Sequence, residues 1–344
     1  MLQWGLIGDC HLGFKTYGTE LRSQETIDVF KQGVDKLSDK PIIFFAGDFF
    51  DDTGVPNWIK KQIIAIKEEH KDQIWFILGG NHDSTKTYSS VSALDVLGEV
   101  NNVIVVNSHE VATWDICGLR VLCIPHVKSQ AEYLGLIDSC ITSESHWDLA
   151  LLHSLVGSKL DLSPNDLNID LYRLDLLAQK CDRVFIGHQH QSEQPLPNVV
   201  IPGSTLEFDF GQLGDKFVYT ESEAILLEQP RKMARLEMEA VKPVDVLELE
   251  LHEDTIYRID IKGIPIEEYS LIKTACDVAE NNFKGVVMFN LYKTGHKELQ
   301  VTAIDARFDL MEEFDTFCAA NNVSIGRMKS VLQDAVSLVS LEED

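Results

Sequence analysis

The strongest constraint on the fold is a set of five short apolar segments, each of which runs directly into polar residues. In chain order the segments read LQWGLIG, PIIFFAG, IWFILGG, WDLALLH and RVFIG, and they lead into the clusters GDCH, GDFFD, GGNHD, HS and GHQH. Segments of this length and apolarity are typical of buried strands. Residues 23–37 and 56–70 lie between them and have the apolar spacing of helices. Buried strands that alternate with helices predict an α/β fold.

The polar clusters predict one shared site at the ends of these strands. In open α/β sheets, ligands bind at the carboxyl ends of the strands. A single histidine at a strand end is more often a hydrogen-bonded structural residue, but five successive strand ends with such residues indicate a common site. The side chains expected at this site are Asp9, His11, Asp48, Asn81, His82, His153, His188 and His190.

The chemistry of these side chains indicates a metal centre. Carboxylate, imidazole and amide ligands suit Mn, Fe or Zn, and the absence of a thiolate among the expected ligands argues against a structural zinc site. The number of ligands is enough for two ions, and one carboxylate can bridge ions ~3.5–4 Å apart. Glycine lets the backbone turn sharply into such a site. The glycines in question are Gly8, Gly47, Gly80 and Gly187.

The series DxH, GDxxD, GNHD, H and GHxH resembles the signature of the calcineurin-like metallophosphoesterases. Within that superfamily, DCHLG, GDFFD and PGSTLEFDFGQLGDKFVY resemble the SbcD family, the nuclease subunits of a double-strand-break repair complex, which are related to the eukaryotic meiotic recombination nuclease. The stretch GDCHLGFK most resembles the phage T4-type recombination nuclease subunit. The resemblance covers nearly the whole chain. It implies an α/β/β/α sandwich with a smaller α+β capping domain and a C-terminal helix pair.

The resemblance also implies a role for each residue of the site. The first metal would be held by Asp9, His11 and His190, the second by Asn81, His153 and His188, and both by Asp48 as the bridging ligand. The metals would be two divalent ions, with Mn²⁺ expected first and Mg²⁺, Fe²⁺ or Zn²⁺ as alternatives. His82 would be a general acid or a stabiliser of the transition state. Asp51 would orient His82, or would only cap a loop, and Asp83 would order the GNHD turn.

The spacing of His188 and His190 suggests how two neighbouring histidines reach one metal pair. Residues two apart in a strand point to the same face. Both imidazoles can therefore face the same metal pair, one reaching each ion, while Gln189 points away. The six remaining histidines are expected to be ordinary surface or core residues: His70, His109, His126, His146, His252 and His296.

The motifs favour a phosphodiester substrate. Protein phosphatases of this superfamily read GDxxDRG and GNHE, and their arginine offsets the charge of a monoester. This chain has Asp52 and Thr53 after Asp51, and GNHD in place of GNHE. The function expected from the SbcD resemblance is a DNA exonuclease and endonuclease in repair, recombination and replication. The alternatives are a cyclic-nucleotide or other small phosphodiesterase, and a non-catalytic scaffold with the same fold.

The C-terminal hundred residues separate these alternatives. We expect a nuclease domain over 1–243, a capping domain that contacts DNA over 244–305, and a helix pair over 306–344. The capping domain would contain a strand within 244–263, a helix over 267–281, and strands over 285–295 and 298–305. Small phosphodiesterases usually lack such an extension.

Two apolar stripes at helical spacing mark the helix pair. They comprise Leu310, Phe314, Phe317 and Cys318, and then Ile325, Met328, Leu332, Ala335, Val336 and Val339. Short helices need a surface to bury against. In the resembled family that surface is the coiled-coil root of an SbcC-type ATPase, in a heterotetramer with a homodimer of nuclease subunits. The alternative is that the stripes pack on the capping domain of the same chain.

The net charge of −25 complicates a DNA-binding function. DNA binding draws on clustered lysine and arginine, yet acidic residues outnumber basic ones in each of the segments 1–150, 151–243 and 244–344. A partner ATPase that supplies the basic surface would resolve the conflict. The seven scattered cysteines, an N-terminus that does not look like a secretory signal and the lack of a long apolar window favour a cytoplasmic protein without a membrane span.

Overall fold

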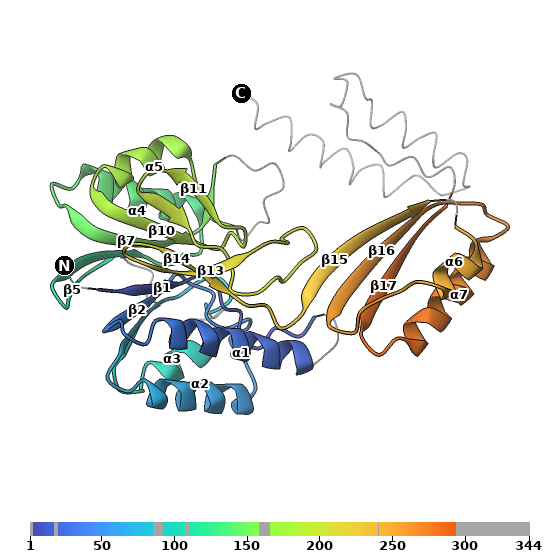
Figure 1. Cartoon of the computed structure of the whole chain (residues 1–344). Coiled ribbons are helices and arrows are strands. Elements are labelled where there is room, and N and C mark those ends of the chain that lie inside the picture. The colour runs from blue at the N-terminus through green and yellow to red at the C-terminus, as the bar shows by residue number, and fades with distance from the viewer. Residues whose placement is uncertain are drawn as a thin grey trace, which may run out of the picture. The chain divides into compact units, whose positions relative to one another are not determined.

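Two six-stranded sheets form the centre of the N-terminal part of the chain (Figure 1). The structure is a computed structural model. It describes residues 3–16, 20–84, 92–107, 111–157, 166–239 and 241–293. The chain divides into the units Met1–Thr294 and Gly295–Asp344. The strand predicted over 298–305 and the helix pair predicted over 306–344 lie outside the described residues.

The first sheet contains the three N-terminal strands that were predicted. Its order is β14 (Ala224–Leu227), β13 (Lys216–Thr220), β1 (Gly5–Ile7), β2 (Ile42–Phe45), β3 (Ile74–Leu78) and β4 (Val103–Val106). Strands β1 to β4 are parallel, and β13 returns late in the chain to pair antiparallel with β1. The carboxyl ends of β1, β2 and β3 therefore lie side by side, with Ile7 level with Phe45 and Phe45 level with Ile77.

The second sheet contains the other two predicted strands. Its order is β11 (Glu193–Leu196), β12 (Val199–Ile201), β10 (Cys181–Gly187), β7 (Trp147–His153), β6 (Leu119–Ile124) and β5 (Ala112–Ile116). Its four central strands are parallel, and Gly187 at the end of β10 lies level with His153 at the end of β7. A short parallel pair, β8 (Leu155–Val156) and β9 (Asn168–Ile169), follows β7.

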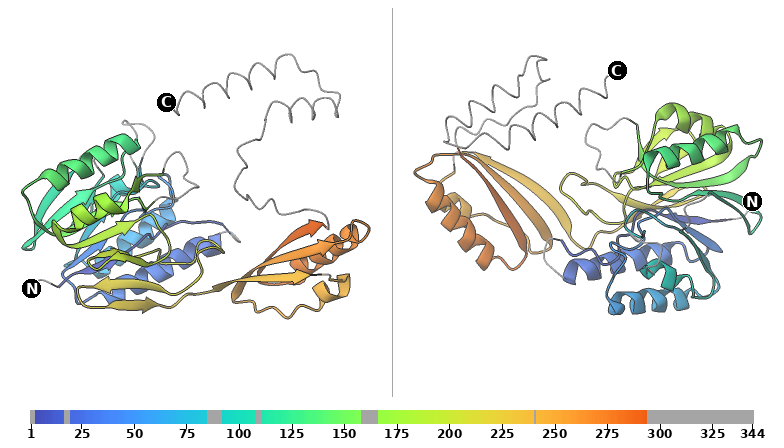
Figure 2. Two further views of the ribbon diagram at one scale, coloured as in Figure 1. Left: turned by 90° about the horizontal axis from the view of Figure 1, so that it is seen from above. Right: turned by 180° about the vertical axis from the view of Figure 1, so that it is seen from behind.

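Helices cover the outer face of each sheet (Figures 1 and 2). The first sheet carries α1 (Glu20–Lys36), α2 (Asn57–Glu69) and α3 (Ala93–Leu97), and the second carries α4 (Gln130–Thr142) and α5 (Leu171–Ala178). The helices predicted over 23–37 and 56–70 are α1 and α2. This order of layers confirms the predicted α/β/β/α sandwich.

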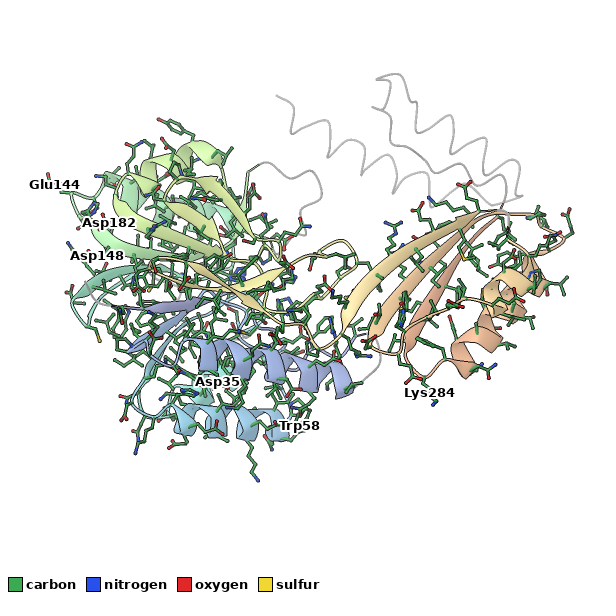
Figure 3. All side chains as sticks on the ribbon, in the orientation of Figure 1. Asp35, Trp58, Glu144, Asp148, Asp182 and Lys284 are labelled. Atoms are coloured by element: carbon green, nitrogen blue, oxygen red, sulfur yellow. The ribbon has the colours of Figure 1, made fainter. Side chains whose placement is uncertain are left out.

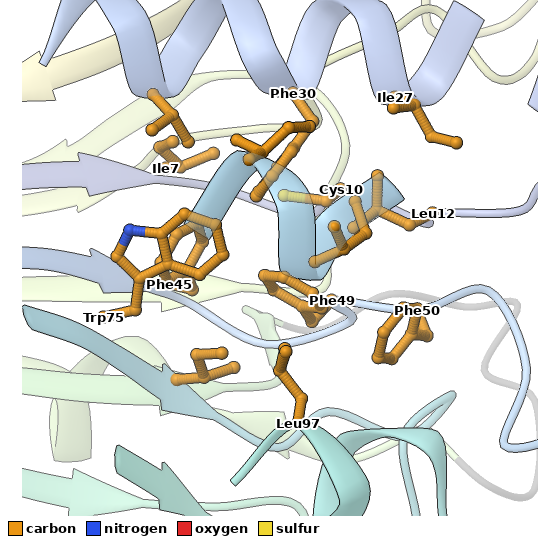
Figure 4. Packing of buried hydrophobic residues seen from close by; sticks show 14 of the residues in the cluster. Ile7, Cys10, Leu12, Ile27, Phe30, Phe45, Phe49, Phe50, Trp75 and Leu97 are labelled. Atoms are coloured by element: carbon orange, nitrogen blue, oxygen red, sulfur yellow. The ribbon is translucent and has the colours of Figure 1, made fainter. Parts of the chain in front are cut away.

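The two faces of each strand explain why three layers of core form. Along β2, Ile43 and Phe45 pack under the helices, while Ile42 and Phe44 pack between the sheets. This alternation is the period-two pattern of a strand. Under α1, rings of Phe30, Phe45, Phe49 and Trp75 pack edge to face (Figure 4). Both faces of the parallel strands are buried, and so their sequences read as continuous apolar runs.

A third, smaller sheet follows in the chain. It consists of β15 (Lys232–Glu239), β16 (Thr255–Ile264) and β17 (Val286–Lys293), which are all parallel. The connections contain α6 (Pro243–Leu247) and α7 (Tyr269–Asn282), and both helices pack on the same face of the sheet. The boundary at 243 remains a prediction, but β15 begins before it and belongs to the third sheet.

A buried charge cluster joins α1 to the start of the third sheet. Arg22 donates to the carboxylate of Glu25 at 2.7 Å and to the backbone carbonyl of Glu207. Arg231 donates to the same Glu25 carboxylate at 2.5 Å. The Glu207 carboxylate accepts the backbone N–H of Met233 in β15. Glu25 thus forms an ion pair with both arginines, and pairing is the condition under which buried charges are tolerated.

The part of the chain that the structure describes contains no helix with the length and apolarity of a bilayer-spanning segment.

The close approach of the two sheets at their carboxyl ends can be tested with Gly187. A Cβ atom there would lie 2.0 Å from the carbonyl oxygen of Ala46 and 2.7 Å from the carboxylate of Asp9. We expect Gly187→Ala to lower the free energy of unfolding by about 1–3 kcal/mol, because backbone must move. The control is Gly135→Ala in α4, where a Cβ meets nothing within 4 Å. Urea denaturation that gives both variants equal stability would contradict the close approach.

Candidate metal centre

The five predicted strand-end clusters lie together, and they come from both sheets. Asp9, Asp48 and Asn81 follow β1, β2 and β3 of the first sheet. His153 ends β7 and His188 follows β10 of the second. Because the sheets face each other, their carboxyl ends form two sides of one site.

Asp9, His11 and His190 form a first group of possible metal ligands, whose ligand atoms lie within 4.8 Å of one another. The Nε2 atoms of His11 and His190 are 3.0 Å apart, and Asp9 Oδ2 is 3.8 Å from His190 Nε2. These are the three residues that the family resemblance implies for the first metal.

Asp48, His153 and His188 form a second such group. Asn81 Oδ1 lies 2.9 Å from His153 Nε2 and 2.9 Å from His188 Nδ1. Asp48 Oδ2 lies 3.2 Å from His153 Nε2 in this group and 3.6 Å from His11 Nε2 in the first. The Asp48 carboxylate is therefore the side chain between the groups, where the resemblance implies the bridging ligand.

The hydrogen bonds of the histidines leave their other ring nitrogens facing one another. The Nδ1 atoms of His11, His153 and His190 lie 3.1 Å from Asp51 Oδ1, 2.9 Å from the Ala46 carbonyl and 2.8 Å from Gln212 Oε1, respectively. A neutral ring that donates through Nδ1 keeps a lone pair on Nε2. In His11 and His190 these lone pairs would point at each other across 3.0 Å. A cation between them makes such an arrangement favourable, and ligating histidines are normally held through their second nitrogen in this way.

Asp9 adds a second sign of a missing cation. Its side chain is fully buried, Oδ2 accepts the backbone N–H of His188 at 2.8 Å, and Oδ1 has no hydrogen-bond partner. A buried carboxylate oxygen without a partner is costly. The first group thus fits a divalent ion in two respects. Its donors are a carboxylate and two imidazoles, and one of its carboxylate oxygens has no other partner.

The pKa shifts show how strongly the site lacks positive charge. Burial and the neighbouring Asp48 carboxylate raise the pKa of Asp9 well above its usual range, against the attraction of His153. Burial would also raise the pKa of Asp48, but attraction by His153, His11 and His82 outweighs it and holds that pKa well below the usual range. Burial would lower the pKa of His153, but Asp48 raises it to about 9. The Asp48 carboxylate therefore favours positive charge in this part of the site.

Three residues of the site have left-handed backbone conformations. The φ angles of His11, Asp48 and His188 are 43°, 44° and 86°. Such angles are uncommon for residues other than glycine and cluster at functional sites. The alternation argument for His188 and His190 was therefore wrong, because His188 lies beyond the end of β10. The turn at His188, and not the pleat of a strand, sends the two rings to different groups.

His82 lies beside the first group with an exposed ring. Its ring packs edge to face against His11, with centroids 4.7 Å apart, and its Nδ1 is 2.7 Å from the backbone carbonyl of Asp51. The carboxylate of Asp51 accepts from His11 instead, at 3.1 Å. Asp51 thus holds His82 through its main-chain carbonyl, while its side chain holds His11.

Several supporting residues were missed in the sequence because their contacts are not local. Gln212 holds His190, and the buried Lys216 donates to the backbone carbonyls of both residues at 3.2 and 2.9 Å. Asp166 lies 3.5 Å from His188 Nε2, which leaves Nδ1 as the ligand atom of that histidine. The only sequence signal for Gln212 and Lys216 was the SbcD-like stretch that contains them, and Asp166 lies outside that stretch.

Two further residues near the site, Asp83 and His126, were predicted from the sequence to have no metal-binding role. The Asp83 carboxylate accepts the backbone N–H groups of Phe49, Phe50 and Gly80 at 3.0–3.1 Å. This confirms that Asp83 orders the turn, and it ties that turn to the loop after β2. His126 was expected to be an ordinary surface or core residue, but burial and repulsion from His153 lower its pKa to about 4, which brings it into the field of the site.

The position of Asp48 generates a prediction on metal content. Asp48→Ala removes the only described carboxylate that lies within 4.0 Å of histidines of both groups. We expect the variant to bind neither ion, whereas the unchanged chain binds two. Mass spectrometry of the purified proteins measures this. Asp182→Ala, at an exposed position at the start of β10, is the matched control and should keep both ions. Two ions in Asp48→Ala would contradict the bridging position.

Comparisons with known proteins agree with this geometry. Three curated relatives carry the name DNA double-strand break repair protein Mre11. The one from Methanocaldococcus jannaschii is 30% identical over 200 residues, which cover 54% of this chain and 50% of the relative. The one from Sulfurisphaera tokodaii is 27% identical over 154 residues (43% and 39%), and the one from Archaeoglobus fulgidus 25% over 287 residues (77% and 63%). The chain thus matches between 39% and 63% of the length of these relatives.

Two solved structures are also similar to this chain. A purple acid phosphatase from yellow lupin, Lupinus luteus, has a TM-score of 0.34 and 16% identity, over 56% of this chain and 38% of the other. A dimetal phosphatase from Danio rerio has a TM-score of 0.30 and 12% identity, over 56% and 71%. A family model described as calcineurin-like phosphoesterase matches residues 5–192, which span both metal-ligand groups. With more than half of its length in that match, the chain belongs to the calcineurin-like phosphoesterase family, and Mre11 proteins are among its relatives.

Proposed function

We propose that the chain is a two-metal DNA phosphodiesterase, an exonuclease and endonuclease that acts as the nuclease subunit of an SbcCD-type complex in double-strand-break repair, recombination and replication. The observation that carries the proposal is the Asp48 carboxylate, which lies between two groups of ligands 3.6 and 3.2 Å from their nearest histidines. The proposed metals are two divalent ions, Mn²⁺ first, with Mg²⁺, Fe²⁺ and Zn²⁺ as alternatives. DNA as the substrate follows from the name of the Mre11 relatives.

Each residue of the site has a defined role under this proposal. Asp9, His11 and His190 hold the first ion, Asn81, His153 and His188 hold the second, and Asp48 contacts both. When bound, such a pair neutralises the charge on the phosphate and lowers the pKa of a water molecule that attacks it. Asp51, Ala46 and Gln212 fix the tautomers of the ligating histidines through their second nitrogens. Lys216 fixes the backbone that carries His190.

His82 is proposed as the general acid on the leaving oxygen. Its Nδ1 lies 2.7 Å from the carbonyl oxygen of Asp51, which accepts the Nδ1–H and orients the ring. A general acid must also carry a proton on Nε2, and the exposed position of His82 lets that nitrogen reach a bound strand. The backbone N–H of His82 donates to Asp48 at 3.0 Å, which fixes the ring relative to the bridging carboxylate.

The loop after Asp51 supports a diester in preference to a monoester. Asp52 accepts the Thr53 hydroxyl at 3.2 Å and the backbone N–H of Gly54 at 3.0 Å, so these positions stabilise the turn. They offer no cation for the extra charge of a monoester. Cyclic-nucleotide hydrolysis remains the alternative activity. A scaffold without activity is disfavoured because it would not need every ligand together with His82.

The proposal is tested by Mn²⁺-dependent cleavage of linear DNA by the purified chain and by its His82→Ser variant. We expect the variant to keep two ions and to cleave ~10²–10⁴-fold more slowly, which is the usual scale of a lost general acid. His70→Ser is the control, because His70 lies on α2's C-terminal side and pairs with Asp35 at 3.0 Å. We expect that control to cleave at the unchanged rate.

Three outcomes would contradict the proposal. Loss of a metal ion in His82→Ser would make His82 a ligand, since it also lies within 4.8 Å of ligand atoms of His11 and Asp48. A faster reaction with cyclic nucleotides than with DNA would favour the small-phosphodiesterase alternative. Absence of both activities from a chain that holds two ions would favour the scaffold.

A coiled-coil ATPase of the SbcC type is the proposed partner, and 306–344 is its proposed binding segment in a heterotetramer with two nuclease subunits. The charge of the chain supports a partner that supplies the basic DNA surface. Within the described residues, acidic side chains such as Glu144, Asp148 and Asp182 extend from the surface (Figure 3). Residues 306–344 lie outside the described residues, and the proposal for them rests on their two apolar stripes.

Replacing Leu332 and Val336 with aspartate tests that segment. We expect the double variant to lose binding to the ATPase, because charge in a contact face costs several kcal/mol, and to keep the melting temperature of the isolated chain. Gln333→Asp with Ser337→Asp places the same charges between the stripe positions and should bind normally. A pull-down and thermal denaturation measure the two effects. A clear fall in melting temperature with binding intact would favour packing of the stripe on the capping domain.

A further inference from the structure

A sixth strand also ends beside the metal-ligand groups. β6 is followed by Pro125 and His126, a strand end without a role so far. We propose that His126 binds the phosphate that neighbours the scissile phosphate on the DNA strand, an inference that rests on the nuclease function proposed above.

Two independent elements place His126 beside the second ligand group. β6 runs parallel to β7, and Ile124 lies level with Leu152, the residue before His153. The backbone N–H of His126 donates to the carbonyl oxygen of Gly79 at 3.4 Å, and Gly79 lies two residues before Asn81. His126 is therefore held between the strand end that carries His153 and the turn that carries Asn81.

The charges that act on His126 confirm this position. After burial, the side chains with the strongest effect on it are His153, Asp48, His188 and Asp166. The first three form the second ligand group, and Asp166 contacts His188. The imidazole therefore lies within the electrostatic field of the second metal position.

His126 is close to the ligands without being one of them. It belongs to none of the three groups of possible ligands found among the described residues. Its side chain is only partly buried, and its ring nitrogens have no hydrogen-bond partner within the described ranges. A neutral imidazole carries one N–H donor, and a donor without a protein acceptor is suited to an oxygen of the substrate.

The geometry of a DNA strand selects the neighbouring phosphate. A phosphate between the two metal positions is surrounded by their ligands and by His82. Each nucleotide of the strand carries its own phosphate, so the next phosphate lies to one side of the metal pair. His126 lies on the side of the second ligand group, which consists of Asp48, His153 and His188. A neutral donor can contact this phosphate without adding charge to the site.

The test uses trithymidylate, which has two phosphodiester linkages, and its two analogues with one uncharged methylphosphonate linkage. The unchanged chain should lose about tenfold in kcat/KM on the analogue whose neutral linkage occupies the neighbouring position. His126→Ala should lose about tenfold on trithymidylate, mainly through KM, and nothing further on that analogue, because both changes remove one contact. His126→Gln keeps a donor N–H and should recover part of the loss.

The control variant is His146→Gln. His146 lies just before β7, at the other end of the strand from His153, and pairs with the exposed Asp182 at 2.9 Å. It should behave as the unchanged chain. Additive losses in His126→Ala would overturn the inference, and so would the loss of a metal ion, because His126 would then support the ligands. No cleavage of trithymidylate by the unchanged chain would refute the nuclease function itself.

Discussion

The buried Asp48 carboxylate is the interaction on which the rest of the site depends. It lies between histidines from both sheets, at the point where a Cβ on Gly187 would collide with the backbone after β2. With a residue larger than glycine at position 187, the two sheets could not approach each other this closely. The sandwich therefore does more than bury apolar surface. It brings two sets of strand ends close enough for one carboxylate to serve both.

The sequence was sufficient to predict the layers and which side chains gather at the strand ends, because both depend on local patterns. Apolar runs identify the strands, and the residues after them identify the site. The hydrogen-bond partner of each histidine's second ring nitrogen could not be predicted, because it comes from a segment distant in the sequence. Gln212, the partner of His190, is an example. Asp51 shows the limit clearly. Its position in the motif was read correctly, but whether its carboxylate or its carbonyl meets His82 depends on the fold of the loop.

The third sheet illustrates a different limit. β15 reads as a polar strand with many charged residues, and its sequence alone does not reveal which sheet it joins. It pairs with β16 over eight residues, and the backbone N–H of Met233 near its start donates to the Glu207 carboxylate. Arg235 and Arg258 both pair with the fully buried Asp260, a contact across two strands that no periodicity predicts.

The position of β1 has a consequence for the order in which the chain can fold during synthesis. β1 lies between β2 and β13, and Gly5 pairs with Thr220, so the first strand to be made waits for one of the last in its sheet. Asp9 likewise bridges to Ser204. Such distant pairings slow folding, because the loop between them must close first. An N-terminal fragment on the ribosome therefore exposes an unpaired strand edge and an incomplete set of ligands until most of the domain has emerged.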